Sequence, residues 1–244
     1  MPYLSVVIPA YNEEKRIAKA LLAYDQYLSK QSYDYELIVV DDGSKDKTAE
    51  VVSNFQKIVR NLKLIDNKEN HGKGWVVKQG MLEAQGEYCM YIDADNAISL
   101  DQIEDFWPYL KQGYDIIIGS IEVEGSKIEE HAAWYRRLLG KMAKYLIRAL
   151  TVWEVHDSQR AFKLFPKNAV NEIFSRQTIE RWGFDIEILV LAKKLGYKIK
   201  ELPVIWINPA ESKVSLGSYF NTLRELLKIK WNLIRGKYDL RKKL

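Results

Sequence analysis

Short apolar runs rich in β-branched residues alternate with helical patterns over the first half of this 244-residue chain. The expected strands are residues 4–8, 35–40, 62–66, 87–92 and 115–118, and the expected helices between them are residues 13–29, 47–59, 74–84 and 100–111. Strands that are apolar throughout and joined by helices are typical of a largely parallel sheet covered on both faces. This pattern predicts an α/β fold whose ligands bind beyond the carboxyl ends of the strands.

Composition adds limits to this fold. With 47% hydrophobic and 29% charged residues, the chain is an ordinary folded protein, long enough for one α/β core with at most a helical appendage. Its single cysteine, Cys89, excludes an internal disulfide and fits a reducing compartment. No signal peptide and no run of roughly 18 apolar residues is evident, so we expect a soluble protein or one bound at a membrane surface.

Basic charge is concentrated toward the C-terminus. Residues 221–244 hold eight Lys/Arg and two Asp/Glu, whereas residues 1–220 carry a balance of −2. An expected helix at residues 129–150 has one basic side as well, and together these segments suit a membrane interface. A solvated basic terminus and helix face is the structural alternative. Because no linker or repeat divides the chain, we expect one catalytic domain, residues 1–215, followed by a basic helical tail, residues 216–244.

Three groups of polar residues follow predicted strands. Residues 9–13 (Pro-Ala-Tyr-Asn-Glu) follow the first strand, residues 41–44 (Asp-Asp-Gly-Ser) the second, and residues 93–95 (Asp-Ala-Asp) the fourth. The carboxyl ends of parallel strands meet at one edge of a sheet, so we expect these groups to converge there.

The Asp-x-Asp pair is a candidate metal site. Asp93 and Asp95 leave a buried strand on one turn, where both carboxylates can reach Mg²⁺ or Mn²⁺ bound to phosphate oxygens. Two carboxylates so close are costly unless a cation neutralises them. Taken alone the pattern is weak, because many loops hold two aspartates.

The other groups have two interpretations each. Asp42, at a strand end, is placed to accept hydrogen bonds from a nucleobase or ribose. A plain turn with Ser44 as the cap of the next helix needs no ligand. Lys73 lies in a glycine-rich run, residues 70–74, that opens a helix and so suits a phosphate.

Together and in this order, these motifs resemble the family 2 glycosyltransferases, most of all the dolichyl-phosphate glucose and mannose synthases. The likeness covers roughly residues 4–215. It rests on the Val-Asp-Asp-Gly-Ser-x-Asp-x-Thr run at residues 40–48, the Asn-x-Gly-Lys-Gly run at residues 70–74, and two runs typical of the glucose-type branch, residues 157–165 and 181–187.

The resemblance implies a GT-A fold with a C-terminal amphipathic helical extension. It implies an inverting transfer of a hexose, from a nucleotide sugar of the UDP-glucose or GDP-mannose type, to a polyprenyl or dolichyl phosphate. Mg²⁺ or Mn²⁺ is expected at Asp93 and Asp95. The expected catalytic residues are Asp95 and Asp157, the latter orienting or deprotonating the acceptor. The expected donor contacts are Pro9, Tyr11, Glu13, Asp42, Lys73, Asp93 and Ala94, with Lys213 facing the diphosphate.

Two residues depart from the family pattern. Ile121 stands where relatives commonly have arginine, so a phosphate contact is missing or comes from Arg136, Arg137 or Arg160. Ala97 stands where the mannose-type branch has a metal-binding glutamine. This second departure favours the glucose-type branch or a metal completed by water.

A lipid acceptor and the basic segments predict a peripheral protein on the cytoplasmic face of a membrane. No nucleic-acid partner is expected, because the basic tail lacks a recognised binding motif. Three alternatives stay open: a related transferase for a glycan or other hydroxyl acceptor, a phosphohydrolase with an Asp-x-Asp nucleophile, and an inactive sugar-nucleotide-binding protein. The phosphohydrolase is disfavoured because its aspartates usually follow the first strand. The sequence leaves the oligomeric state open.

Overall fold

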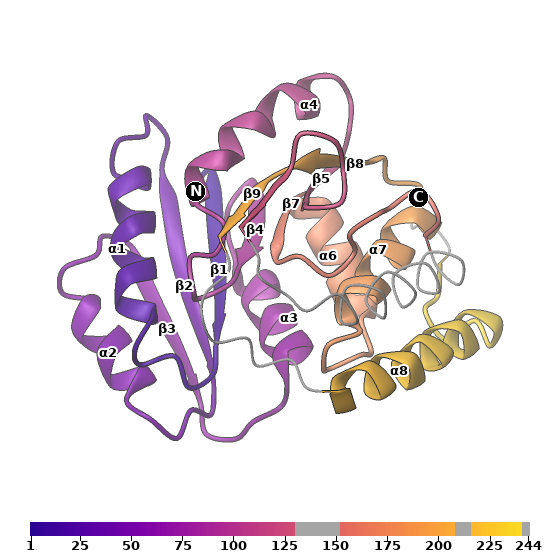
Figure 1. Ribbon diagram of the computed structural model, residues 1–244, viewed down its shortest axis with the longest axis horizontal. Helices are drawn as coiled ribbons and strands as arrows, with labels where there is room; N and C mark the ends of the chain where they lie inside the picture. Colours follow the sequence, from indigo (N-terminus) through magenta and orange to yellow (C-terminus); the bar gives the residue numbers. More distant parts are fainter. Residues whose placement is uncertain (130–151, 208–215, 241–244) are drawn as a thin grey trace.

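A seven-stranded sheet forms the centre of the computed structural model, which describes residues 1–129, 152–207 and 216–240 (Figure 1). Its strands lie in the order β3-β2-β1-β4-β7-β5-β8. They are β1 (Leu4–Ala10), β2 (Tyr35–Asp42), β3 (Leu62–Asn67), β4 (Tyr88–Ile92), β5 (Ile116–Ser120), β7 (Phe162–Pro166) and β8 (Ile199–Pro203). A two-stranded sheet pairs β6 (Lys127–Glu129) with β9 (Ile205–Ile207).

The large sheet is parallel except at β7, which pairs antiparallel with both β4 and β5. The predicted α/β class is therefore confirmed. Strands β1 and β2 are buried along their whole length, as expected for a sheet covered on both faces. Pro9 fits near the end of β1 because pairing with β4 stops at Val7, so its missing N–H disrupts no ladder on that side.

Helices cover both faces of the sheet, and each face has its own apolar core. Helices α1 (Ile17–Leu28) and α2 (Thr48–Phe55) lie on one face, and α3 (Lys73–Glu83), α6 (Lys167–Arg176) and α7 (Phe184–Lys194) lie on the other (Figure 1). The two layers fix the strands between them. The loops at the carboxyl ends of the strands are therefore held on a rigid base.

Helix α8 (Leu216–Ile234) lies beside α7, which confirms the predicted C-terminal helical extension (Figure 1). Its Leu226 and Ile229 are buried in the same core as α3 and α7. Its Leu227 and Trp231, in contrast, are 60% and 52% exposed. Across the described part of the chain, no helix combines the length and the apolar character that crossing a bilayer requires.

Two predicted helices have different boundaries from those expected. The segment 100–111 is divided into a 3₁₀ helix, η1 (Leu100–Asp105), and a short α-helix, α4 (Trp107–Lys111). Pro108 causes the division, because it lacks an N–H and is favourable only in the first turn of a new helix. Glu129 ends β6 instead of starting a helix, and the rest of the predicted 129–150 helix lies outside the described residues.

The predicted cap of α2 is also wrong. Ser44 is too far from the first turn of α2 and donates its Oγ–H to Asp41 Oδ1 at 2.5 Å. The acceptor for the first helical amide is Asp46, whose Oδ1 lies 3.0 Å from Thr48 N. Ser44 therefore serves the loop after β2, not the helix.

Candidate active site

The loops that follow β1 and β2 are hydrogen-bonded to each other at one edge of the sheet. Asn12 N donates to Ser44 Oγ at 2.9 Å, and Lys45 N donates to Asn12 Oδ1 at 2.8 Å. Glu13 N donates to Thr48 Oγ1 at 2.7 Å. Asn12 has a φ of 54°, a left-handed conformation in which asparagine is enriched. The first two polar groups thus lie together, as the sequence predicted.

Asp42 holds the loop that leads into α3. Its carboxylate accepts hydrogen bonds from Asn70 Nδ2 at 2.9 Å, His71 N at 2.7 Å and Gly72 N at 2.9 Å. Burial nevertheless raises the pKa of Asp42. Gly72 has a φ of 108°, and a Cβ at this position would lie 2.6 Å from the carbonyl oxygen of Glu180. Asp42 is therefore a loop anchor, and its contact with a nucleotide stays a prediction.

Asp93 and Asp95 follow β4 at the same edge. Lys73 Nζ, from the first residue of α3, lies 2.5 Å from Asp93 Oδ1. Tyr24 OH donates to the main-chain oxygen of Asp93 at 2.8 Å, and Asp95 Oδ1 accepts from Ala97 N at 3.0 Å. The side chains of Asp93 and Asp95 are 43% and 19% exposed, so a ligand can reach both. The predicted convergence of the three strand-end groups is confirmed.

The charges at this pair are tightly coupled. Burial, and then the negative charge of Asp93, raise the pKa of Asp95. Burial acts against the charge of Lys73, but Asp93, Asp185 and Asp95 outweigh it and raise the Lys73 pKa. The site therefore favours a protonated Lys73, and it disfavours the negative charge of Asp95 relative to that of a solvated aspartate.

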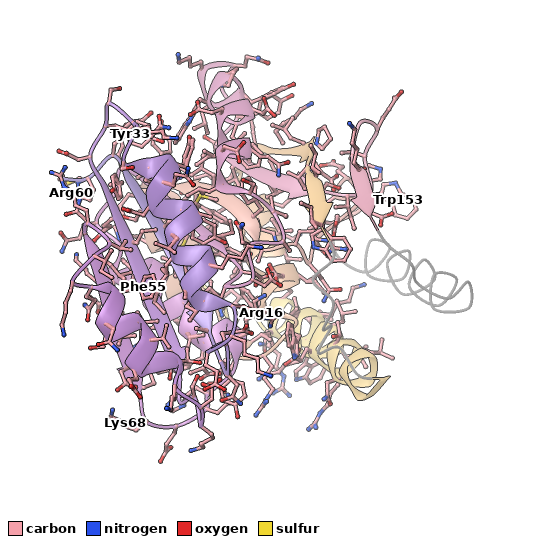
Figure 2. The ribbon with its side chains drawn as sticks, turned by 60° about the vertical axis from the view of Figure 1, so that its left-hand side comes forward. Arg16, Tyr33, Phe55, Arg60, Lys68 and Trp153 are labelled. Carbon is pink, nitrogen blue, oxygen red and sulfur yellow. The ribbon has the colours of Figure 1, made fainter. Side chains whose placement is uncertain are left out.

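Arg16 links the loop after β1 to the carboxylate pair. Its Nε and Nη2 donate to the two oxygens of Glu13, both at 2.7 Å. Its Nη1 lies 3.9 Å from Asp95 Oδ2. Figure 2 shows Arg16 toward the end of the molecule that carries these loops, while Tyr33 lies at the opposite end. The guanidinium of Arg16 thus lies between the carboxylates of Glu13 and Asp95.

The donor set at Asp93 and Asp95 fits Mg²⁺ or Mn²⁺. Carboxylate oxygens are the ligands these cations prefer. Asn96, next in the chain, has a buried Oδ1 without a hydrogen-bond partner and a left-handed φ of 54°. In the described ranges, no three or more His, Cys, Asp and Glu side chains form a cluster suited to a metal. A cation here would therefore complete its ligand shell with water or phosphate oxygens, and it would share Asp93 with Lys73.

A small cavity of about 40 Å³ connects the carboxylate pair with Arg160 and Trp206. The guanidinium carbon of Arg160 lies 4.5 Å from the centroid of the Trp206 ring, in a cation–π contact. Arg160 Nε donates to Asp157 Oδ2 at 3.1 Å. Two elements thus fix Arg160 beside the pair, one by stacking and one by a charged hydrogen bond.

Asp157 is 3% exposed and also accepts from the amide of Ile121, at 3.3 Å. Arg160 therefore lies next to the position where relatives commonly carry arginine. Of the three predicted substitutes, Arg160 is brought to the site, while Arg136 and Arg137 lie outside the described residues. Asp157 is buried and accepts a hydrogen bond from Arg160, so it is suited to position this cation.

A buried ion pair lies beneath Arg160 and was missed by sequence reasoning. Lys163 Nζ lies 2.6 Å from Asp185 Oδ1, and Tyr91 OH donates to the same oxygen at 2.5 Å. Lys163 is fully buried and Asp185 is 2% exposed. Lys163 Nζ also donates to the carbonyl of Arg160, so the pair fixes the chain that carries this arginine. Lysine in a strand and aspartate in a first helical turn are usually solvated, and the only signal was the apolar residues flanking Lys163.

The segment between α6 and α7, residues 177–183, closes the site on the α3 side. Trp75 N donates to Glu180 O at 3.0 Å. Gln177 Nε2 donates to the carbonyl of Gly74 at 2.8 Å. The Nζ of Lys73 lies 5.4 Å from the centroid of the Trp182 ring. This segment therefore helps to hold the lysine that contacts Asp93.

Glu187, which sequence reasoning placed only at the start of a helix, is the buried anchor of this segment. It accepts from Thr178 Oγ1 at 2.7 Å, Ile179 N at 2.8 Å and Tyr238 OH at 2.7 Å. Asn232 Nδ2 of α8 donates to Thr178 Oγ1 at 3.0 Å. The site wall thus depends on α8 as well as α7.

The remaining predicted contacts are only partly described. Pro9 is buried at the end of β1, and Ala94 is 4% exposed between the two aspartates. Tyr11 is 39% exposed at the same edge. Lys213 lies outside the described residues.

Comparison with known proteins places this arrangement in a family. Residues 5–174 match the model of Glycosyl transferase family 2. The dolichyl-phosphate beta-glucosyltransferase ALG5A of Trichomonas vaginalis is 38% identical, over 93% of this chain and 72% of the relative. The dolichyl-phosphate beta-glucosyltransferase of Homo sapiens is 34% identical, over 97% of this chain and 78% of the relative.

Solved structures support the predicted GT-A fold. Mannosyl-3-phosphoglycerate synthase from Rubrobacter xylanophilus has a TM-score of 0.69 at 16% identity, over 100% of this chain and 77% of that structure. Glucosyl-3-phosphoglycerate synthase from Mycobacterium tuberculosis, in complex with Mn²⁺, UDP and phosphoglyceric acid, also has a TM-score of 0.69, at 19% identity over 99% of this chain and 80% of that structure. The family match over most of the chain, relatives above 30% identity and this fold all agree: the chain belongs to glycosyl transferase family 2 and is a glycosyltransferase.

Proposed function

We propose that this protein transfers glucose from a nucleotide sugar, of the UDP-glucose type, to dolichyl phosphate or a related polyprenyl phosphate, with inversion at the anomeric carbon. The observation that carries the proposal is that Asp93, Asp95 and Arg160 line the same small cavity. A metal-binding carboxylate pair suits the diphosphate of a donor, and a fixed cation suits an anionic acceptor. Relatives named as dolichyl-phosphate beta-glucosyltransferases supply the choice of sugar and acceptor.

We assign the metal to Asp93 and Asp95, with Mg²⁺ or Mn²⁺ as the ion. When bound, such an ion neutralises charge on the departing nucleoside diphosphate. Lys73 is placed to add a second positive charge on the donor side, since its Nζ is 2.5 Å from Asp93 and its pKa is raised. A protonated lysine at the start of a helix stabilises phosphate both by charge and by the adjacent amides.

The rest of the donor site is assigned to the loops after β1 and β2. Pro9, Tyr11, Glu13 and Asp42 are proposed to surround the nucleotide, with Ala94 between the two metal ligands. Hydrogen bonds between the two loops fix their relative position. Lys213, from outside the described residues, is proposed to face the diphosphate.

Arg160 is proposed to bind the acceptor phosphate, and Asp157 to orient Arg160. A polyprenyl phosphate has a second pKa near ~6 and is largely dianionic at neutral pH, so its oxygen needs little help from a general base. A buried Asp157 that holds a cation agrees with this mechanism better than an exposed base would. Arg136 and Arg137 are retained as further acceptor contacts.

A lipid-borne acceptor implies work at a membrane surface, and we propose a peripheral location on the cytoplasmic face. The single cysteine, Cys89, is buried, and burial raises its pKa to about 11, so its thiol is unreactive. A chain without a disulfide suits a reducing compartment, where nucleotide sugars are also made.

The test is transfer of labelled glucose from UDP-glucose to dolichyl phosphate in detergent, with and without Mn²⁺ or Mg²⁺. We expect a lipid-linked product that requires the ion, with GDP-mannose as a poorer donor. Turnover on a soluble sugar hydroxyl with none on the lipid phosphate would select the glycan-type alternative. Metal-independent phosphate release would select the hydrolase, and nucleotide binding without any product would select the inactive binding protein.

A further inference from the structure

Helix α8 has two faces of opposite character. Leu226, Ile229 and Asn232 are 2%, 0% and 5% exposed and pack on the protein. Leu223, Leu227, Trp231 and Ile234 are 38%, 60%, 52% and 77% exposed. Their spacing of four, four and three residues places these four side chains in one stripe along the helix. An apolar stripe of this length on a solvated helix requires an explanation.

Cations border this stripe. Arg224 and Lys228 lie on the same helix, Arg235 directly follows its end, and Arg181 reaches the groove from the segment before α7. The groove between Arg181 and α8 has a volume of about 890 Å³. The guanidinium of Arg235 lies 4.3 Å from the centroid of the Trp231 ring. Apolar side chains and a tryptophan beside Lys and Arg are the composition that binds the interface of an anionic bilayer.

The single acidic residue of α8, Glu225, lines the groove and is half-buried. Glu225 accepts a hydrogen bond from Gly183 N at 2.7 Å. A Cβ on Gly183 would lie 2.8 Å from Glu225 Cβ, so the two chains are in direct contact. The carboxylate of Glu225 is thus engaged by a main-chain amide of the protein, and burial raises its pKa, which disfavours its negative charge.

The groove also borders the donor side. Arg181 precedes Trp182, whose ring lies 5.4 Å from Lys73 Nζ. Lys73 in turn contacts Asp93. A bilayer docked along α8 would therefore lie next to the site that must receive a lipid-borne phosphate.

We propose that the exposed face of α8, together with Arg181, is a docking surface for an anionic phospholipid bilayer. The stripe enters the interface, Trp231 lies at the level of the headgroups, and Arg224, Lys228 and Arg181 contact lipid phosphates. The proposal deepens the membrane acceptor assigned above, but it concerns binding alone. Vesicles without dolichyl phosphate or nucleotide sugar therefore test it separately from the proposed transfer reaction.

The experiment is co-sedimentation of the full chain with phosphatidylcholine vesicles, with and without phosphatidylserine, at physiological salt. We expect binding only to the anionic vesicles. The double variant Arg224→Ala/Lys228→Ala should lower the partition coefficient on the order of 20-fold, since each surface cation contributes appreciably to binding of an anionic leaflet. Leu227→Ser/Trp231→Ser should lower it as well, which a purely electrostatic contact would not show.

The matched control is the exposed patch after α2, where Ile58 is 69% exposed and lies between Lys57 and the exposed Arg60. Figure 2 shows Arg60 on the opposite side of the molecule from α8. Lys57→Ala/Arg60→Ala and Ile58→Ser should leave vesicle binding unchanged. Circular dichroism confirms that each variant is folded, and quenching of tryptophan fluorescence by brominated lipid should fall in Trp231→Phe.

Three results would overturn the proposal. One is equal binding to neutral and anionic vesicles. Another is unchanged binding of both α8 double variants, with the α2 controls also unchanged. The third is a vesicle-free oligomer, seen by size-exclusion chromatography, that the α8 variants convert to monomer. That last outcome would assign the face to a second copy of the chain.

Discussion

The two sides of the active site are built in different ways. The donor side consists of the loops after β1, β2 and β4 with the start of α3, and neighbouring loops hydrogen-bond one another at the edge of a parallel sheet. The acceptor side consists of residues 157–163 together with residues 177–187, a segment that also contacts Lys73 on the donor side. It is held from below by buried charges, the Lys163–Asp185 pair and Glu187. The difference is that Asp93 and Asp95 are partly exposed, whereas the charges that hold the acceptor side are buried.

This comparison predicts that the largest loss of activity with little loss of stability comes from the donor side. Asp95→Ala should lower kcat/KM about 10³-fold, because it removes one of two carboxylates proposed to hold the metal. The change in unfolding free energy should be small, since Asp95 is partly exposed. Radiolabelled transfer over a range of Mn²⁺ concentrations measures the first, and urea denaturation the second.

Asp105→Ala is the control for this variant, because Asp105 is an exposed aspartate of η1 away from the site. Its activity should match that of the unchanged protein. Full activity of Asp95→Ala in the presence of a chelator would contradict the metal assignment.

The largest loss of stability should come from the acceptor side. Asp185→Ala leaves Lys163 as an uncompensated buried charge, so the unfolding free energy should fall by about 3–5 kcal/mol. Lys163→Met/Asp185→Leu should recover much of this loss, because it removes both charges. Denaturant titration measures each variant.

An exposed ion pair provides the contrast. Lys68 lies 2.5 Å from Asp66, with side chains 82% and 38% exposed, so Asp66→Ala should cost no more than about 1 kcal/mol. Equal losses of unfolding free energy in Asp66→Ala and Asp185→Ala would contradict the claim that buried charges hold the acceptor side.

Sequence reasoning predicted that the loops after β1, β2 and β4 converge, but it missed the buried charges beneath Arg160, for a physical reason. Apolar strands and polar residues at their carboxyl ends are local patterns, and parallel pairing brings those ends together. Asp185 is 22 residues from Lys163 in the chain, and Tyr238, one of the partners of Glu187, is 51 residues from it. Tertiary packing decides whether a charged side chain is buried, so no periodic pattern in the sequence marks Lys163 or Glu187 as buried.

Some local errors have the same origin. Strand β7 was not among the expected strands, and its antiparallel pairing with β4 and β5 joins segments far apart in the chain. Ser44 was expected to cap α2, but Asn12, which is 32 residues away, donates to it instead. Contacts between loops override the local preference of serine for helix starts.

The coupled charges of Asp93, Asp95 and Lys73 predict a pH dependence of metal binding on the donor side. Burial and Asp93 raise the pKa of Asp95, so Mn²⁺ affinity should fall as the pH is lowered, with a midpoint above the ordinary aspartate range. Lys73→Met should raise this midpoint again, because a nearby positive charge is lost. It should also weaken UDP binding about tenfold, as expected for one charged hydrogen bond. Isothermal titration at several pH values measures both, and an unchanged midpoint in Lys73→Met would contradict the coupling.

A smaller loss of stability than at Asp185 is expected where Glu225 of α8 meets Gly183. Glu225→Ala should lower the unfolding free energy by about 1–3 kcal/mol, because the amide of Gly183 loses its acceptor. Glu225→Gln keeps an acceptor oxygen and should cost much less. The pKa of Glu225 is raised by burial, so its stabilising effect relative to Gln is greatest at low pH and is lost as the pH rises through that pKa. Denaturant unfolding at about pH 4 and about pH 8 compares the unchanged protein with Glu225→Gln. A larger stability advantage of Glu225 over Gln at the higher pH would contradict this prediction.

We infer that one site has a donor side organised by Asp93 and Asp95 and an acceptor side organised by Arg160. The most direct measurement is isothermal titration of Arg160→Ala with UDP plus Mn²⁺, combined with the KM of the same variant for dolichyl phosphate. We predict unchanged affinity for UDP and a KM for the lipid raised about tenfold or more. Weakened UDP binding with an unchanged lipid KM would contradict the assignment of the two sides.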